Sequence, residues 1–127
     1  MASDALYRLA GGESTLRAVI TDFYDAVFSD LMIGFFFAKS NKARLIEKEL
    51  ELISEHLGAP GVHYRGRELR EAHQAHRIMG GHFERRLQLL REAMARHALP
   101  VEVQEAWIAH ARSLRGKVTP MPGGDCE

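Results

Sequence analysis

The sequence contains a single cysteine, Cys126, so no disulfide can form within the chain. This scarcity is typical of a reducing compartment, and we expect a cytoplasmic protein. Seventeen Lys and Arg residues balance seventeen Asp and Glu residues. Because nucleic acids and anionic membranes are bound by surfaces with a basic excess, this balance argues against both as partners. No apolar run approaches the ~18 residues that a membrane span requires, and the first residues show no charged-then-apolar signal pattern.

Several familiar catalytic and metal-binding motifs are also missing. The chain has no GxSxG nucleophile motif, no HExxH or CxxC pair, and no phosphate-binding glycine loop. A hydrolase would need an activated nucleophile, and the lone cysteine lies beside the last residue of the chain. Histidine, in contrast, is abundant, with seven residues. The sequence therefore directs attention to histidine chemistry outside the common zinc motifs.

Nearly every segment has apolar residues at helical spacing, and no segment shows the alternation of a β-strand. The pattern predicts an all-α domain over residues 1–118, followed by a disordered tail over 119–127. We expect helices over about 4–10, 14–29, 41–57, 67–77 and 82–97, and a last helix with Pro100 in its first turn. Asp4 and Asn41 have the chemistry of N-caps. A short, very apolar segment, MIGFFFAKS, connects the second and third predicted helices.

Four polar side chains fall on faces that the helical pattern makes apolar. Tyr24 lies at the edge of the stripe of its helix, and Glu49 lies near the middle of the stripe of the next predicted helix. His73 and His76 lie three residues apart and so share one helix face. Each has an ordinary alternative: a core tyrosine that reaches solvent or a backbone carbonyl, a glutamate that reaches water past Lys48, and satisfied core or surface histidines.

If these four side chains point inward together, they form a polar group inside an apolar cavity. One inward histidine with a few polar groups opposite it is the arrangement that a haem pocket requires. The alternatives that remain open are a helical protein that uses its histidines for a non-haem metal, and a purely structural bundle.

The chain resembles the truncated haemoglobins, and group I in particular. Over about residues 5–118 the resemblance is carried by LYRLAGGESTLRAVITDFYDAVFSD, FFFAKSNKARL, YRGRELREAHQAHRI and HFERRLQLLREAM, followed by a helix that starts at a proline. The resemblance implies a truncated globin fold, a two-over-two helical sandwich around haem b. It further implies reversible binding or transport of dioxygen, with nitric oxide and carbon monoxide as other diatomic ligands.

The resemblance also implies roles for individual residues. His73 corresponds to the iron ligand, and Tyr24 corresponds to the tyrosine that hydrogen-bonds dioxygen. His76 then becomes a neighbour at the haem edge rather than a second ligand. The remaining positions that correspond to haem-contacting residues are Phe23, Phe37, Arg44, Leu45, Lys48, Ile53, Tyr64 and Leu69.

Glu49 departs from the family pattern, in which this position carries glutamine or a small neutral residue. An ionised carboxylate only accepts hydrogen bonds, so it cannot stabilise dioxygen as an amide does. It could instead act as the acid–base group of a peroxidase-like reaction, and nitric oxide oxidation assisted by an unidentified reductase is a further alternative. A haem-based sensor also remains open. Lys48 could serve as an internal sixth ligand if deprotonated, although contact with solvent or a propionate is favoured.

The assignment of His73 generates the first prediction. His73→Ala should abolish stable haem binding, or leave binding that free imidazole rescues, because imidazole is the axial ligand that the resemblance assigns. His76→Ala is the matched control and should keep the Soret band, with modestly weaker haem retention. Absorption spectra of both variants test this. Loss of haem in His76→Ala alone would reverse the assignment.

Overall fold

The computed structural model describes residues 4–62 and 80–114, and every regular element in these ranges is helical. The elements are α1 (Ala5–Ala10), α2 (Gly12–Ser29), the 3-10 helix η1 (Gly34–Phe37), α3 (Lys42–His56), α5 (Gly80–Arg96) and α6 (Val101–Ser113). The all-α prediction is confirmed for this part of the chain. The helix predicted over 67–77 and the tail predicted over 119–127 lie outside the described residues, so the proposed domain boundary stays a prediction.

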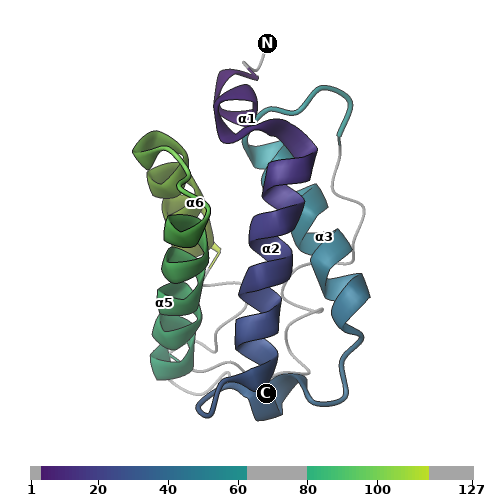
Figure 1. The fold of residues 1–127 in the computed structure, drawn as a ribbon, viewed down its shortest axis with the longest axis vertical. Coiled ribbons are helices and arrows are strands. Elements are labelled where there is room, and N and C mark those ends of the chain that lie inside the picture. Colours follow the sequence, from purple (N-terminus) through teal and green to yellow (C-terminus); the bar gives the residue numbers. More distant parts are fainter. Residues whose placement is uncertain (1–3, 63–79, 115–127) are drawn as a thin grey trace.

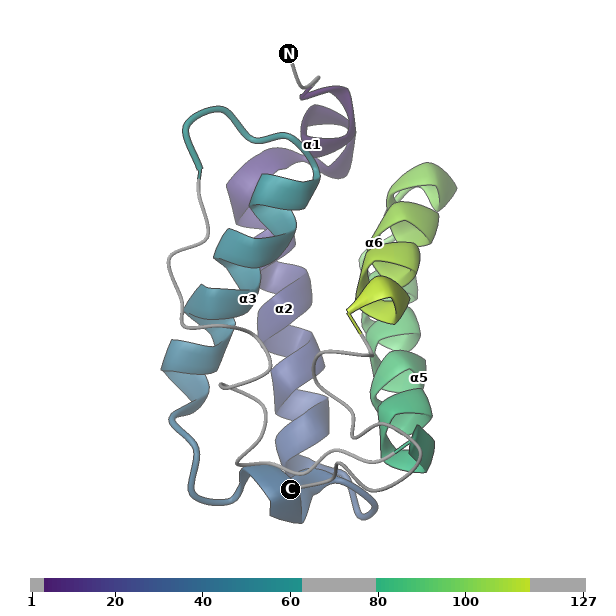
Figure 2. The ribbon, with the colours of Figure 1, turned by 180° about the vertical axis from the view of Figure 1, so that it is seen from behind.

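Helix α2 is the central element. Figures 1 and 2 show it between α3 on one side and the pair α5 and α6 on the other, with the long helices running along the long axis of the molecule. Helix α1 lies at the end of the molecule where α2 begins. The helices thus form two pairs, α2 with α3 and α5 with α6. Among the described residues, no helix is long and apolar enough to cross a membrane.

The helix ends follow the sequence signals with small differences. The chain leaves α1 at Gly11, whose φ of 100° is left-handed and favours glycine. Asn41 caps α3 as predicted, since its side chain accepts from the backbone N–H of Arg44 at 3.0 Å. Asp4 makes no side-chain cap; it pairs with Arg8 at 3.2 Å across the first turn of α1.

Pro100 precedes the last helix instead of lying in its first turn. Its extended ψ of 146° makes it the N-cap, so α6 begins one residue later, at Val101. The carbonyl of Pro100 accepts from the N–H groups of Val103 and Gln104, both at 3.0 Å. A residue without an N–H group is suited to this position, where the donor would have no partner in the helix.

The predicted apolar stripes form the core. The buried side chains on α2, α5 and α6 include Leu16, Val19, Ile20, Phe23, Val27, Phe83, Leu87, Leu90, Met94, Val103 and Trp107. All were expected to face inward from their helical spacing. Ala111 is also buried, Phe28 packs partly buried against the core, and Leu114 is half-buried. The core therefore joins α2 to the α5 and α6 pair along most of its length.

The corner between α2 and α3 is fixed by Asp30, the residue that ends α2. One oxygen of its carboxylate accepts from the N–H groups of Met32 and Ile33 at 2.9 and 3.1 Å. The other accepts from Nη2 and Nε of Arg85 on α5, at 2.6 and 3.0 Å. The Asp30 side chain is only 6% exposed. Hydrogen bonding by Arg85 holds the pKa of Asp30 below its ordinary value, although burial opposes this shift.

Close backbone packing completes this corner. Helix η1 begins at Gly34, where a Cβ atom would lie 2.8 Å from the carbonyl oxygen of Phe28. Any other residue would push η1 away from the end of α2. Because η1 ends with the buried Phe37, the corner places an aromatic side chain against the core.

Asp30→Asn should lower the free energy of unfolding at neutral pH by about 1.5–3 kcal/mol, the usual worth of hydrogen bonds to a charged group. Asp25→Asn is the matched control on the same helix, because Asp25 pairs with Lys42 at the surface, where an ion pair contributes only about 0–1 kcal/mol. Equal losses in urea unfolding of the two variants would contradict the anchoring role of Asp30.

The pair of Asp30 and Arg85 also predicts that the stability of the protein depends on pH. Because the pKa of Asp30 is lowered from 3.8, its contribution to stability is fully present above that pH. The contribution is lost as the pH falls further, through the pKa of the folded state. Urea unfolding of the parent should therefore converge on that of Asp30→Asn in strongly acidic buffer.

Candidate functional site

A polar cluster lies where four helices meet inside the protein. It contains Tyr24 from α2, Glu49 from α3, Arg86 from α5 and Trp107 from α6. Tyr24 is 3% exposed, Arg86 8% and Trp107 1%, and the Glu49 side chain is 14% exposed. Polar groups that are buried to this extent require hydrogen-bonding partners, because an unpaired group would lose its hydration without compensation.

The side chains of the cluster satisfy one another. Oε1 of Glu49 accepts from Nη2 of Arg86 at 3.5 Å, and Oε2 accepts from Nε1 of Trp107 at 3.4 Å. Arg86 also hydrogen-bonds the side chain of Tyr24, where the guanidinium is the donor and the phenol oxygen the acceptor. Both distances to Glu49 are long for hydrogen bonds, so this ion pair is loosely held.

The guanidinium of Arg86 is the fixed charge of the cluster. Burial lowers the pKa of Arg86, but the interactions with Tyr24 and Glu49 outweigh burial and raise the pKa overall. The guanidinium carbon lies 5.0 Å from the centre of the Phe23 ring, which adds a cation–π interaction. Arg86 therefore stays charged while it is enclosed by a phenol, a carboxylate and an aromatic face.

Aromatic side chains surround the cluster on the α2 side. The ring centres of Phe23 and Tyr24 are 4.8 Å apart, and those of Tyr24 and Phe28 are 6.4 Å apart. Phe28 in turn lies 5.9 Å from Phe37 of η1. On α3, Ile53 is fully buried in the same core. The polar cluster is thus bordered by an apolar wall that limits access of water.

The residues predicted for the site are placed as follows. Phe23, Phe37 and Ile53 are buried, and Leu45 packs half-buried against the core. Arg44 is exposed in the first turn of α3, and Lys48 is half-buried. Tyr24 and Glu49 both point inward, and both contact Arg86. The remaining predicted residues, Tyr64, Leu69, His73 and His76, lie outside the described residues, and their roles stay predictions.

Two members of the cluster were not assigned to the site from the sequence, although Trp107 was expected in the core. Arg86 follows Phe83 by three residues and precedes Leu90 by four, which places it on the apolar stripe of α5. Arg86, like Glu49, is therefore a charged residue on an otherwise apolar helix face. The signal is weaker for arginine, because its long chain ordinarily carries the charge out to solvent.

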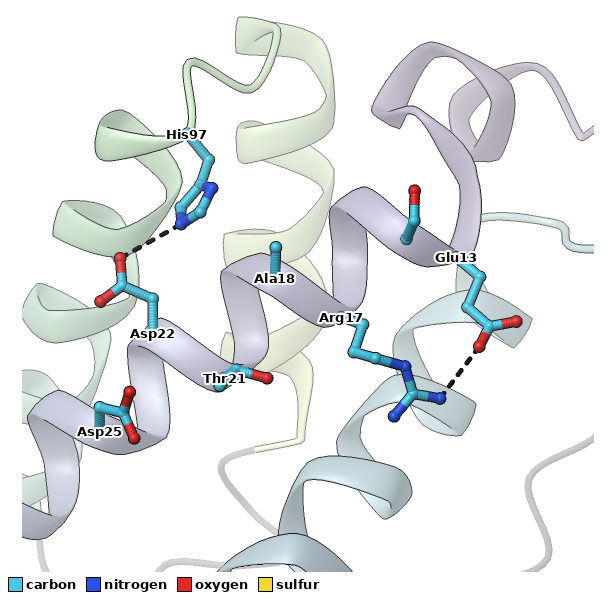
Figure 3. Close-up of a pocket in the computed structure, with 8 residues that line it drawn as sticks. Glu13, Arg17, Ala18, Thr21, Asp22, Asp25 and His97 are labelled. Atoms are coloured by element: carbon cyan, nitrogen blue, oxygen red, sulfur yellow. Dashed lines mark hydrogen bonds and ion pairs between the residues drawn. The ribbon is translucent and has the colours of Figure 1, made fainter.

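A hollow lies on the polar face of α2. It is an open groove of about 810 Å³, lined by Glu13, Ser14, Arg17, Ala18, Thr21, Asp22, Asp25 and His97. Figure 3 shows His97 directed at Asp22 and Arg17 directed at Glu13, at 3.2 and 2.9 Å respectively. Asp22 also accepts from Nε of Arg96 at 2.9 Å. The two contacts of Asp22 attach the end of α5 to α2, whereas the Arg17–Glu13 pair lies within α2; we assign the groove this structural role.

Within residues 4–62 and 80–114, no three His, Cys, Asp or Glu side chains lie close enough together to hold a metal ion. His73 and His76, the residues on which a non-haem site was considered, lie outside these ranges.

The known proteins that this chain is similar to in sequence are globins. The family described as bacterial-like globin matches residues 5–120. The group 1 truncated hemoglobin GlbN of Mycolicibacterium paratuberculosis is 31% identical over 98 residues, which cover 77% of this chain and 71% of that protein. The group 1 truncated hemoglobin of Tetrahymena pyriformis is 28% identical over 79 residues, which cover 62% of this chain and only 64% of the length of that relative.

Solved structures show the fold. The crystal structure of the Tetrahymena pyriformis truncated hemoglobin in its Fe(III) form has a TM-score of 0.81 and 22% identity, covering 90% of this chain and 97% of that chain. The 2/2 hemoglobin from Synechococcus sp. PCC 7002, with covalently attached heme, has a TM-score of 0.81 and 19% identity, covering 89% and 96%. The predicted two-over-two helical sandwich is confirmed.

The Glu49–Arg86 pair predicts a coupled effect on stability. Arg86→Met should lower the free energy of unfolding by about 2–4 kcal/mol, because it leaves the carboxylate of Glu49 without its cation in a largely buried position. The double variant Glu49→Gln/Arg86→Met should recover part of this loss, since an amide needs no counter-charge and can still accept from Trp107. Urea unfolding of Arg86→Met, Glu49→Gln and the double variant measures the coupling energy between the two residues. Strictly additive losses would contradict it.

Proposed function

The chain belongs to the bacterial-like globin family, and we propose that it is a truncated globin that binds haem b and reversibly binds dioxygen and other diatomic ligands beside Tyr24. Membership in the family implies haem-based binding of diatomic ligands. The identity of the haem, the preference among gases and a cytoplasmic location are proposals. The observation that carries the function is a buried tyrosine hydroxyl held by Arg86 inside an aromatic wall.

The described residues fit a haem. A flat, apolar macrocycle needs aromatic and aliphatic surfaces, which Phe37, Leu45 and Ile53 offer next to the polar cluster. Its propionates need cations at a solvent-accessible edge, and the exposed Arg44 on α3 has this chemistry. Haem, when bound, supplies an iron that binds diatomic gases. We propose His73 as the residue that ligates this iron, because neutral imidazole is a common axial ligand.

Tyr24 is the residue that we propose to contact the gas. A hydroxyl donates and accepts at once, so acceptance from Arg86 leaves its donor function intact. A hydrogen bond received from a cation also polarises the hydroxyl and strengthens the bond that it donates. The wall formed by Phe23, Phe37 and Ile53 excludes water, which would otherwise compete for that donor.

Two reactions that involve turnover are secondary proposals. Glu49 brings a carboxylate into the cluster, and a carboxylate is a suitable proton acceptor for a peroxidase-like reaction. Oxidation of nitric oxide would need a reductase that the chain does not identify. We favour reversible binding, because Arg86 and Trp107 already occupy both oxygens of Glu49.

An absorption spectrum of the protein reconstituted with haemin tests the cofactor. We expect a strong Soret band, and extraction of an unmodified haem b into organic solvent. A protein that takes up no haemin would contradict the proposed function.

Tyr24→Phe should speed dioxygen dissociation by roughly two- to tenfold, because one net hydrogen bond is worth about 0.5–1.5 kcal/mol. Release of carbon monoxide should change much less, since this ligand carries less charge and gains less from a donor. Stopped-flow dissociation of both gases makes the comparison. Similar changes for both would mean that Tyr24 acts by its shape.

A further inference from the structure

We propose that Arg86 forms an anion-binding subsite in the polar cluster, which takes small monovalent anions such as fluoride, and that Glu49 is its internal competitor. This inference rests on the proposed function, because the anion would bind on the haem side that Tyr24 faces. It concerns the preference between anionic and neutral ligands, to which Arg86 adds a positive charge beside the hydrogen-bond donor of Tyr24.

The charge of Arg86 is costly to bury. Arg86 is 8% exposed on the apolar stripe of α5, where methionine or leucine would fill the core without any desolvation penalty. Replacing buried ion pairs by apolar residues is often neutral or stabilising. A fixed cation at this position is therefore not explained by stability alone.

The guanidinium of Arg86 can hydrogen-bond only to acceptors. It carries five N–H donors and no acceptor, so any additional partner must be an acceptor. Within the described ranges its polar partners are Glu49, at 3.5 Å, and Tyr24. The long distance to Glu49 indicates a pair that a stronger acceptor can replace. Among small ligands an anion is a strong acceptor, and carbon monoxide is a weak one.

Two aromatic side chains of α2 orient the guanidinium of Arg86. The face of the Phe23 ring lies 5.0 Å from the guanidinium carbon, and the phenol of Tyr24 accepts from the same group. These contacts hold the cation beside Tyr24, the residue proposed to contact the ligand. An anion that binds there meets two donors, the guanidinium and the phenol, in surroundings where charge-assisted hydrogen bonds are strong.

Glu49 sets the affinity of this subsite. Its carboxylate accepts from Arg86 and carries the same sign of charge as the anion. Glu49→Gln removes the competing charge while it keeps the size of the side chain and an acceptor for Trp107. We therefore expect tighter anion binding in this variant.

Optical titration of the haemin-reconstituted ferric protein with fluoride tests the proposal, and carbon monoxide release from the ferrous protein is the neutral comparison. Glu49→Gln should raise fluoride affinity by roughly three- to tenfold, and Arg86→Met should lower it by roughly ten- to hundredfold. Arg91→Gln removes an equal charge from the exposed face of α5 and should leave fluoride affinity unchanged. Carbon monoxide release should be unchanged in Arg91→Gln, and in the other two variants it should change less than fluoride affinity does, because carbon monoxide carries little charge.

The double variant Glu49→Gln/Arg86→Met keeps the test valid if Arg86→Met alone folds poorly. We expect it to bind fluoride as weakly as Arg86→Met, although it lacks the competing carboxylate. Fluoride binding as tight as in Glu49→Gln would overturn the subsite, and so would equal effects of Arg86→Met and Arg91→Gln. In both cases a normal Soret band leaves the proposed function intact. A missing Soret band in the parent protein would instead overturn the proposed function.

Discussion

The charge of Arg86 is the constraint on which the interior of this protein depends. A guanidinium cannot give up its proton, so its burial on α5 obliges the neighbouring helices to supply acceptors. Helix α3 supplies Glu49 and α2 supplies Tyr24, while Trp107 of α6 donates to the second oxygen of Glu49. The two helix pairs of the sandwich are therefore joined through this buried polar cluster as well as through apolar packing.

Two adjacent arginines on α5, Arg85 and Arg86, have side chains that point in different directions. Successive residues of a helix point about 100° apart, so Arg85 and Arg86 contact different parts of α2 and its surroundings. Arg85 binds Asp30 at the end of α2, and Arg86 enters the cluster beside Tyr24. The first contact fixes the corner that carries Phe37, and the second fixes the polar group that Phe37 and its neighbours enclose. One turn of α5, with Arg85 and Arg86, thus positions both the aromatic wall and the hydrogen-bond donors of the polar cluster.

The sequence predicted the helices and their buried faces, because apolar spacing and capping residues act over one or two turns. It predicted Tyr24 and Glu49 as inward candidates for the same reason, although it left both with ordinary alternatives. It could not supply their partners. Glu49 meets Arg86 and Trp107 across 37 and 58 residues of sequence, and helical periodicity has no bearing on contacts at such separations. The position of Arg86 on the apolar stripe of α5 did not identify it as a site residue, since a long basic side chain ordinarily carries its charge to solvent.

The departure at Glu49 and the burial of Arg86 are best understood as one feature. A neutral amide at the Glu49 position would offer its own donor to a ligand, whereas a carboxylate offers none. In this chain the carboxylate of Glu49 on α3 pairs with the guanidinium of Arg86 on α5. Under the anion subsite proposed above, the donors to a ligand would come from α5 instead of α3 and would carry a positive charge. Such a site would respond to the charge of a ligand, because a loosely held ion pair can exchange its internal anion for an external one.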